Sequence, residues 1–163
     1  MRDIQQTITA CFTAQGLMHT LGTRLLSITP GEVHIALKPS PALTQQDGFV
    51  HAGALTTILD SACGYAAMTV APDHCNVLTV EFKVNLLRPA LADEFVAIGK
   101  VVKPGKTLTV CTAEVIGTRD GEAKTIAIMQ ATIANVPVQP SEVTERPQPA
   151  QPPAAPTPPS TPA

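Results

Sequence analysis

The sequence predicts an α+β domain in which an antiparallel β-sheet curls round one long central helix. Three observations lead to this fold class. The predicted elements follow in the order helix, two strands, long helix, four strands. The last four strands are joined by short turns, which suit antiparallel neighbours. The long helix is apolar or made of small residues on nearly all sides, so it needs cover over most of its surface.

The chain begins with a predicted short helix. Asp3 is a good N-cap residue, and Gln6 stands three positions later, as in a capping box. Apolar residues, beginning with Ile4 and Ile8, then recur at helical spacing. Gly16 is expected to end this helix, because glycine readily adopts the backbone conformation that closes many helices.

Two short strands and a long helix follow. The strands, Thr23–Thr29 and Glu32–Lys38, are separated by Pro30-Gly31, a strong turn signal. The segment Pro39–Val50 contains two prolines, one glycine and five polar residues, so we expect an irregular loop. The helix is predicted over Ala52–Met68, since its apolar and polar residues separate at helical spacing. Its narrow strip of small polar residues suits a close neighbour on that side.

The second half of the chain is predicted to form four strands. Residues alternate cleanly along Val77–Leu87, so one face should be apolar and the other polar. Pro104-Gly105 suits the central positions of a type II turn, and Asp120-Gly121 suits a hairpin turn. The apolar face of the first strand would carry Leu78, Val80, Phe82, Val84 and Leu86, and the polar face Thr79, Glu81, Lys83 and Asn85. The remaining strands are predicted over Phe95–Val102, Thr107–Ile116 and Ala123–Ala134.

Length and composition exclude several classes of protein. A chain of 163 residues suits one domain with a substantial core. A formal charge of −2 and an aromatic content of 3% argue against a nucleic-acid partner, which needs basic clusters or stacking platforms. The longest largely apolar run, Cys63–Ala71, is well short of the roughly 20 residues of a membrane helix. The first twenty residues contain no apolar core of a signal peptide. The sequence therefore predicts a cytoplasmic protein without a membrane partner.

Two further features bound the folded part of the chain. Residues 1–136 are predicted to form the domain and residues 137–163 a disordered tail, because ten prolines fall in the last 27 residues. The cysteines are widely spaced, and none has a histidine at metal-ligand spacing. We therefore expect no metal site and no cofactor, and small buried hydrophobic side chains at Cys11, Cys63, Cys75 and Cys111.

The residues around the start of the long helix carry the main chemical signal. The first N–H groups of a helix lack partners within it, so those of Ala52 and Gly53 could hold a developing oxyanion. Asp60 has no Lys or Arg within four positions, and it could act as a general base or nucleophile. The alternatives are a helix start that only packs and a carboxylate on an exposed strip. Eight residues of helix span about 12 Å, so Ala52 and Asp60 of one copy cannot both touch one carbonyl carbon. A two-fold dimer with antiparallel central helices would supply the pair.

The segment GFVHAGALTTILDSACGYAAM resembles the signature of the phenylacetate-pathway (PaaI-like) hotdog thioesterases. In that family His-Gly-Gly begins the central helix and an acidic residue follows nine positions after the histidine, as Asp60 follows His51. The likeness continues through Leu78–Ala90 and Val101–Val115, and it covers about residues 15–136. One residue departs from the pattern, because Ala52 stands where the family has its first motif glycine. An alanine keeps the backbone donor, since helical φ suits any residue.

The resemblance implies a hotdog fold, a homodimer or homotetramer with active sites at the dimer interface, and hydrolysis of acyl-CoA thioesters without metal or cofactor. It implies that Ala52 donates the oxyanion-hole N–H and that Asp60 is the base or nucleophile. It also implies that Gln45 positions the thioester or water, that Thr79 assists the water and that His51 has a supporting role.

The resemblance further places the CoA nucleotide near the turn around Gly105. Lys103, Lys106 and Arg88 would pair with its phosphates, although a solvated hairpin tip is an equal alternative for any one of them. Asn85 would contact the pantetheine arm, and Gly53 would allow close approach of the substrate. Aryl-acetyl, hydroxybenzoyl and medium-chain acyl groups all stay open.

Two rival functions use the same fold. A hotdog acyl-CoA hydratase or dehydratase would need an acid–base pair, but the segment Asp-x-Asn-Pro-x-His typical of hydratases is absent from the sequence. A non-catalytic acyl-CoA-binding protein would not need Asp60, Gln45 and Thr79 together. The sequence therefore favours a hydrolase.

Overall fold

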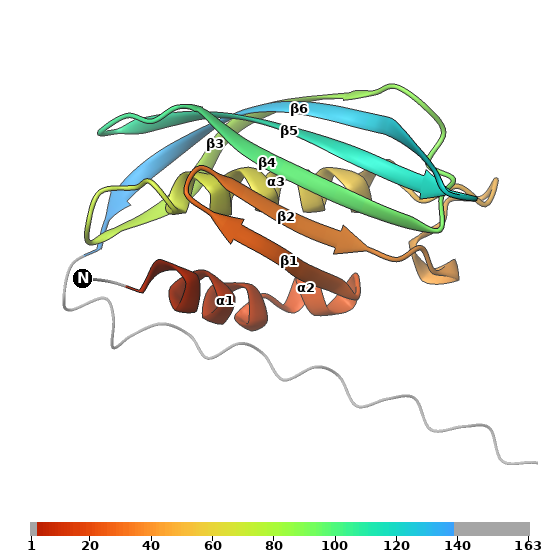
Figure 1. Cartoon of the computed structure of the whole chain (residues 1–163), viewed down its shortest axis with the longest axis horizontal. Coiled ribbons are helices and arrows are strands. Elements are labelled where there is room, and N and C mark those ends of the chain that lie inside the picture. The colour runs from red at the N-terminus through yellow and green to blue at the C-terminus, as the bar shows by residue number, and fades with distance from the viewer. Residues whose placement is uncertain (1–2, 139–163) are drawn as a thin grey trace, which may run out of the picture.

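The computed structural model describes residues 3–138 of the chain. Figure 1 shows an antiparallel sheet that wraps round a central helix, with two short helices beside its first strand. The six strands have the order β1-β2-β4-β5-β6-β3. The elements are α1 (Ile4–Ala14), α2 (Gly16–Thr20), β1 (Thr23–Thr29), β2 (Glu32–Leu37), a 3-10 turn η1 (Pro41–Leu43), α3 (Ala52–Met68), β3 (Cys75–Leu86), β4 (Glu94–Lys103), β5 (Leu108–Arg119) and β6 (Glu122–Pro137). This is the α+β hotdog fold that the sequence predicts.

The N-terminal helix begins as predicted but ends differently. The Asp3 carboxylate accepts a hydrogen bond from the Gln6 N–H at 3.1 Å, which confirms the N-cap. Helix α1 stops at Ala14, and the extended backbone of Gln15 breaks the helical path. Gly16 therefore starts the five-residue helix α2 instead of ending α1. The Gln15 N–H still reaches a carbonyl of α1, so the break is compact.

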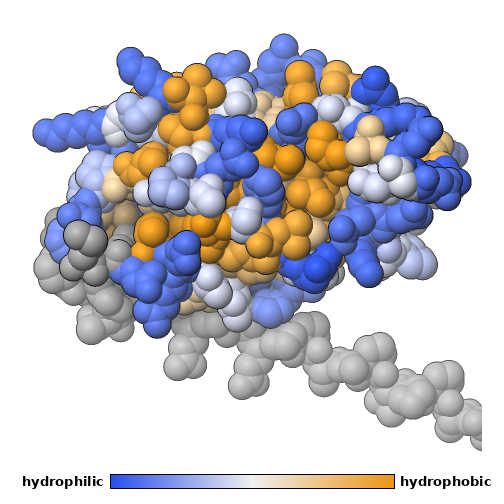
Figure 2. Space-filling model, in the orientation of Figure 1, coloured by the Kyte–Doolittle hydropathy of each residue, from blue (hydrophilic) through white to orange (hydrophobic). Residues whose placement is uncertain are grey.

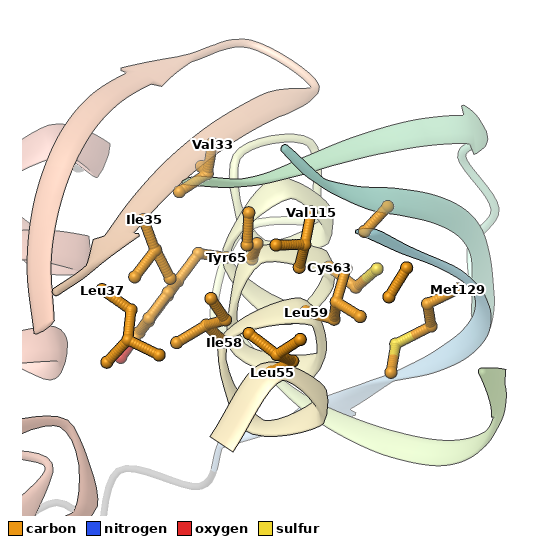
Figure 3. Packing of buried hydrophobic residues seen from close by; sticks show 14 of the residues in the cluster. Val33, Ile35, Leu37, Leu55, Ile58, Leu59, Cys63, Tyr65, Val115 and Met129 are labelled. Carbon is orange, nitrogen blue, oxygen red and sulfur yellow. The ribbon is translucent and has the colours of Figure 1, made fainter. Parts of the chain in front are cut away.

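Helix α3 forms the centre of the core. Ten of its 17 residues are buried, as the side-chain pattern predicts. Figure 3 shows Leu55, Ile58 and Leu59 pointing from α3 into a cluster with side chains from the surrounding strands. The backbone of β4 comes so close to α3 that a Cβ on Gly99 would collide with the backbone of Ala62. The close neighbour of α3 is therefore β4, on a different side from the small polar strip.

The strict alternation predicted for β3 is wrong. An extra residue, Val80, interrupts the pairing of β3 with β6 directly after Thr79. Thr79 pairs with the buried Ile133 and faces α3, because cross-strand partners lie on the same side of a sheet. Phe82, beyond the bulge, also faces α3, whereas Leu78 faces away. One extra residue thus reverses the side on which the earlier side chains lie.

The connection between β4 and β5 also differs from the prediction. Gly105 lacks the positive φ that the third position of a type II turn requires. A glycine is needed there for another reason, because a Cβ on Gly105 would collide with the Leu108 carbonyl oxygen. The other two predicted turns are confirmed. Gly31 has φ 79°, and Asp120-Gly121 has φ 52° and 80°.

Apolar side chains also lie on the surface. Figure 2 shows them gathered in the middle of the face seen in Figure 1, with hydrophilic side chains interspersed and dominant at its ends. Several large exposed apolar residues belong to β3, which is an edge strand, and Leu78 is 62% exposed. An edge strand with such side chains is a ready surface for pairing.

The remaining predictions concern the cysteines, a membrane helix and the C-terminal tail. Cys63, Cys75 and Cys111 are buried, as expected, and Cys11 is half-buried. Burial raises the pKa of the Cys111 thiol to about 11, so it stays neutral. Among residues 3–138, no helix is long and apolar enough to cross a membrane. The predicted tail lies, apart from residues 137 and 138, outside the described residues.

Candidate active site

The start of α3 presents one free backbone donor. His51 is the N-cap residue, with φ −61° and ψ 138°, and its Nδ1 accepts the Gly53 N–H at 2.9 Å. The Ala54 N–H bonds to the His51 carbonyl at 3.0 Å. Within the described chain, the Ala52 N–H has no acceptor. Of the first three N–H groups of this helix, that of Ala52 is the one left for a ligand.

Backbone hydrogen bonds fix the position of this helix start. The His51 N–H donates to the Leu43 carbonyl at 2.8 Å, and the Val50 N–H donates to the Ala90 carbonyl at 3.0 Å. Gly53 has no room for a side chain without disturbing the cap, because its Cβ would lie 3.0 Å from the His51 Nδ1. The cap thus gives a local steric reason for a glycine at position 53 in this chain.

Gln45 lies in the loop before His51, but its side chain is used within that loop. Its amide oxygen accepts the Asp47 N–H, and its Nε2 donates to the Asp47 carboxylate at 3.5 Å. The Gln45 N–H bonds to the Phe49 carbonyl at 2.8 Å, which closes the loop. In a single chain, therefore, Gln45 shapes the loop next to the helix start and does not contact Asp60.

Asp60 and Thr79 form the second part of the site. The Thr79 hydroxyl donates to the Asp60 Oδ1 at 2.7 Å, a contact that depends on the bulge in β3. Asp60 is half-buried, and it has no ion-pair partner among the described residues. Its Oδ2 has no hydrogen-bond partner there either. The carboxylate is thus held by one oxygen and available at the other.

An open pocket of about 700 Å³ lies beside Asp60, between α1, α2, α3 and β3. Its wall carries a polar pair that sequence reasoning missed. The Gln15 Nε2 donates to the Tyr65 hydroxyl at 2.6 Å. Burial raises the pKa of Tyr65, so the hydroxyl stays protonated at neutral pH. Tyr65 is the chain's one tyrosine, but nothing in the sequence links it to Gln15, which lies fifty residues away.

The predicted CoA-binding residues do not meet within one chain. Arg88 donates to the Thr125 carbonyl at 2.6 Å, at one end of β6. The segment that carries Lys103 and Lys106 lies at the other end, where Asn135 contacts it. Ten residues of extended strand separate Thr125 from Asn135, about 33 Å. The structure thus places Arg88 near the start of α3 and the two lysines near its end.

Asn85 lies on the outer face of the sheet. It pairs with Ile128 and lines a second pocket, of about 400 Å³, on the side of the sheet away from α3. Asp60 lies on the inner side, so within one chain Asn85 is separated from it by the sheet. The structure thus brings together Asp60 with Thr79 and His51 with Gly53, and it places the two pairs at different points along α3.

The N-cap predicts a measurable effect of His51 on stability. Replacing His51 with Ala leaves the Gly53 N–H without its partner and should lower the free energy of unfolding by about 1 kcal/mol. His51→Asn keeps an accepting atom at the cap and should stay close to wild type. Urea unfolding of the three proteins measures this. Equal losses in both variants would contradict the capping role.

Comparisons with known proteins agree with this fold. The profile of the thioesterase superfamily matches residues 47–124. A "putative esterase" of Halobacterium salinarum is 31% identical over 121 residues, which are 69% of this chain and 80% of the relative. A 1,4-dihydroxy-2-naphthoyl-CoA hydrolase of Listeria monocytogenes is 26% identical over 73% of this chain and 94% of its own. The crystal structure of a thioesterase family protein from Silicibacter pomeroyi superposes with a TM-score of 0.81, at 47% identity, over 83% of this chain and 99% of that one. The chain therefore belongs to the thioesterase superfamily.

Proposed function

We propose that this protein hydrolyses acyl-CoA thioesters, with aryl-acyl or medium-chain acyl groups, to a free acid and CoA, as a PaaI-like member of the superfamily. The observation that carries the proposal is that α3 presents a free N–H at its start and, eight residues later, a carboxylate held by a hydroxyl. A backbone donor can stabilise the oxyanion of acyl transfer, and a carboxylate can activate water or attack the carbonyl itself.

The residues have the following roles in this mechanism. Thr79 holds the Asp60 Oδ1, which leaves Oδ2 to take a proton from water or to attack the thioester carbon. The carbonyl oxygen becomes an oxyanion and accepts the Ala52 N–H. Collapse of the tetrahedral intermediate breaks the C–S bond and releases CoA thiolate, which takes up a proton. If Asp60 attacks directly, water then hydrolyses the resulting anhydride.

The complete site requires two copies of the chain. Ala52 and Asp60 lie about 12 Å apart along one helix, too far for one carbonyl group. The exposed apolar edge strand β3 offers the contact for a homodimer. A two-fold axis across β3 would run the two α3 helices antiparallel, so that Ala52 of one copy faces Asp60 of the other. Larger assemblies, such as a homotetramer, would keep this dimer.

The same symmetry assembles the basic residues. Arg88 lies at the end of the sheet that carries the start of α3, and Lys103 and Lys106 lie at the opposite end. An antiparallel pair of chains brings Arg88 of one copy to the end that holds the lysines of the other. Three cations would then face the phosphates of one CoA.

Free-thiol release from a panel of acyl-CoA thioesters tests the function. The panel contains phenylacetyl, benzoyl, dihydroxynaphthoyl, hexanoyl and decanoyl thioesters. A matched set of oxygen esters, followed by release of the free acid, serves as the control. We expect turnover of at least one thioester and little of its oxygen ester, because a thiolate leaves more readily. Tight acyl-CoA binding by the folded protein without turnover would overturn the hydrolase and favour the binding protein.

A further inference from the structure

The segment 104–107, between β4 and β5, has no local turn to hold its shape. Gly105 has no positive φ, so the Pro-Gly pair does not close a type II turn. Proline has no N–H to donate. Lys103 and Lys106 flank this pair, and both are exposed and without an ion pair among the described residues. What orders the two lysines must therefore come from elsewhere in the chain.

Asn135 of β6 holds the segment through three hydrogen bonds. Its side-chain Nδ2 donates to the Gly105 carbonyl at 2.8 Å and to the Lys106 carbonyl at 3.3 Å. Its backbone N–H donates to the Thr107 carbonyl at 2.8 Å. Three successive carbonyl groups are thus fixed by one residue from the last strand. The sequence gives no hint of this tether, because Asn135 lies about thirty residues away.

The Asn135 side chain lowers the folding stability, because one of its polar atoms is buried without a partner among the described residues. Asn135 is 7% exposed, and its Oδ1 is buried without a hydrogen-bond partner among the described residues. A buried acceptor without a partner is unfavourable and rare in folded proteins. An apolar residue would avoid this, so the contacts of Nδ2 are the reason for an amide at this position.

We propose that Asn135 is a positioning residue for CoA recognition, which orders the segment from Lys103 to Lys106 so that both lysines can meet the phosphates of the nucleotide. This inference rests on the proposed function for its substrate. Without the tether the segment must be ordered when the ligand binds, and ordering mobile side chains weakens binding. Asn135 touches neither the thioester nor the phosphates.

The test compares two thioesters of the same acid, one of CoA and one of pantetheine, which lacks the nucleotide. We expect Asn135→Ala to raise KM for the CoA thioester about fivefold relative to KM for the pantetheine thioester. Lys103→Gln combined with Lys106→Gln should raise the same ratio about tenfold, which corresponds to about 1.4 kcal/mol. Adding Asn135→Ala to the two lysine changes should raise it little further, because all three act through one segment. Arg24→Gln removes a charge on β1, the edge strand farthest from β3, and is the control that should leave the ratio unchanged.

The outcomes separate this inference from the proposed function. Equal loss of activity on both thioesters in folded Asn135→Ala protein, or an effect that adds fully to that of the lysines, would overturn the positioning role. If Asn135→Ala does not fold, Gly105→Ala perturbs the same segment and should show the same selective rise. If wild type hydrolyses neither thioester, the hydrolase proposal fails. The inference is then decided by calorimetry, where Asn135→Ala must weaken CoA binding but not pantetheine binding, and equal binding of both ligands by wild type would overturn it.

Discussion

Replacing Ala52 with Pro is expected to lower kcat by about 10²- to 10³-fold while the protein stays folded. Proline has no backbone N–H, so this change removes the donor of Ala52. That N–H has no acceptor within the described chain. The first position of a helix tolerates proline well. The preceding residue, His51, already has the extended ψ of 138° that a following proline requires. Ala52→Gly keeps the donor and should stay near wild type in steady-state kinetics.

Asp60→Asn should lower kcat at least as much as Ala52→Pro does, because the amide keeps the shape of the carboxylate but cannot take a proton. Together the two variants test whether each site is shared between copies. In a mixed dimer the Asp60→Asn copy supplies Ala52, and the Ala52→Pro copy supplies Asp60. Unfolding and refolding an equal mixture should therefore restore about a quarter of wild-type activity, since half of the dimers carry one intact site of two. Two inactive variants that stay inactive when mixed would place the whole site in one chain.

Gly99→Ala is expected to destabilise the fold by about 3 kcal/mol, because overpacking of a close contact forces the backbone to move. A Cβ on Gly99 would collide with the backbone of Ala62 and would lie 2.7 Å from the Cys63 nitrogen. These are backbone atoms in the middle of α3, so no side chain can turn aside. Strand β4 would have to move away from the central helix, and the core on both sides of it would loosen.

Thermal unfolding measures this effect against a matched control in the same helix. The expected loss for Gly99→Ala is about 10 °C in Tm, or failure to accumulate as folded protein. Gly64→Ala adds the same methyl group to α3 where, apart from the adjacent residues and the backbone of the helix itself, no described atom lies within 4 Å of the new Cβ. Alanine favours a helix over glycine by up to about 1 kcal/mol, so Tm should hold or rise. A similar Tm for the two variants would show that β4 can move away from α3 without loss.

The sequence was sufficient for the features that depend on neighbours along the chain. Helical spacing located α3 at Ala52–Met68, and Asp3 was identified as the cap of α1. The turns at Gly31 and Gly121 followed from residue types that tolerate positive φ. Asp60 was singled out because a carboxylate without a nearby cation is unusual on such a helix. The resemblance to hotdog thioesterases rested on the segment GFVHAGALTTILDSACGYAAM and on the likeness of Leu78–Ala90 and Val101–Val115.

Tertiary structure decided everything that depends on contacts between distant segments. The bulge at Val80 turns Thr79 toward Asp60, and no pattern within β3 reveals it, because the register is set by pairing with β6. The shape of the segment around Gly105 is likewise held by Asn135 from another strand and not by its own turn residues.

The sequence by itself thus determined the fold class and the candidate carboxylate, since both follow from local periodicity and residue type. The structure decided how the candidates are grouped. Asp60 lies with Thr79, Gly53 is capped by His51, and the Ala52 N–H is left free. The structure also showed that Arg88 and Lys103 lie at opposite ends of β6. The physical reason is that hydrogen bonds and packing between distant segments set register and close approach, and neither is encoded in any short stretch of residues.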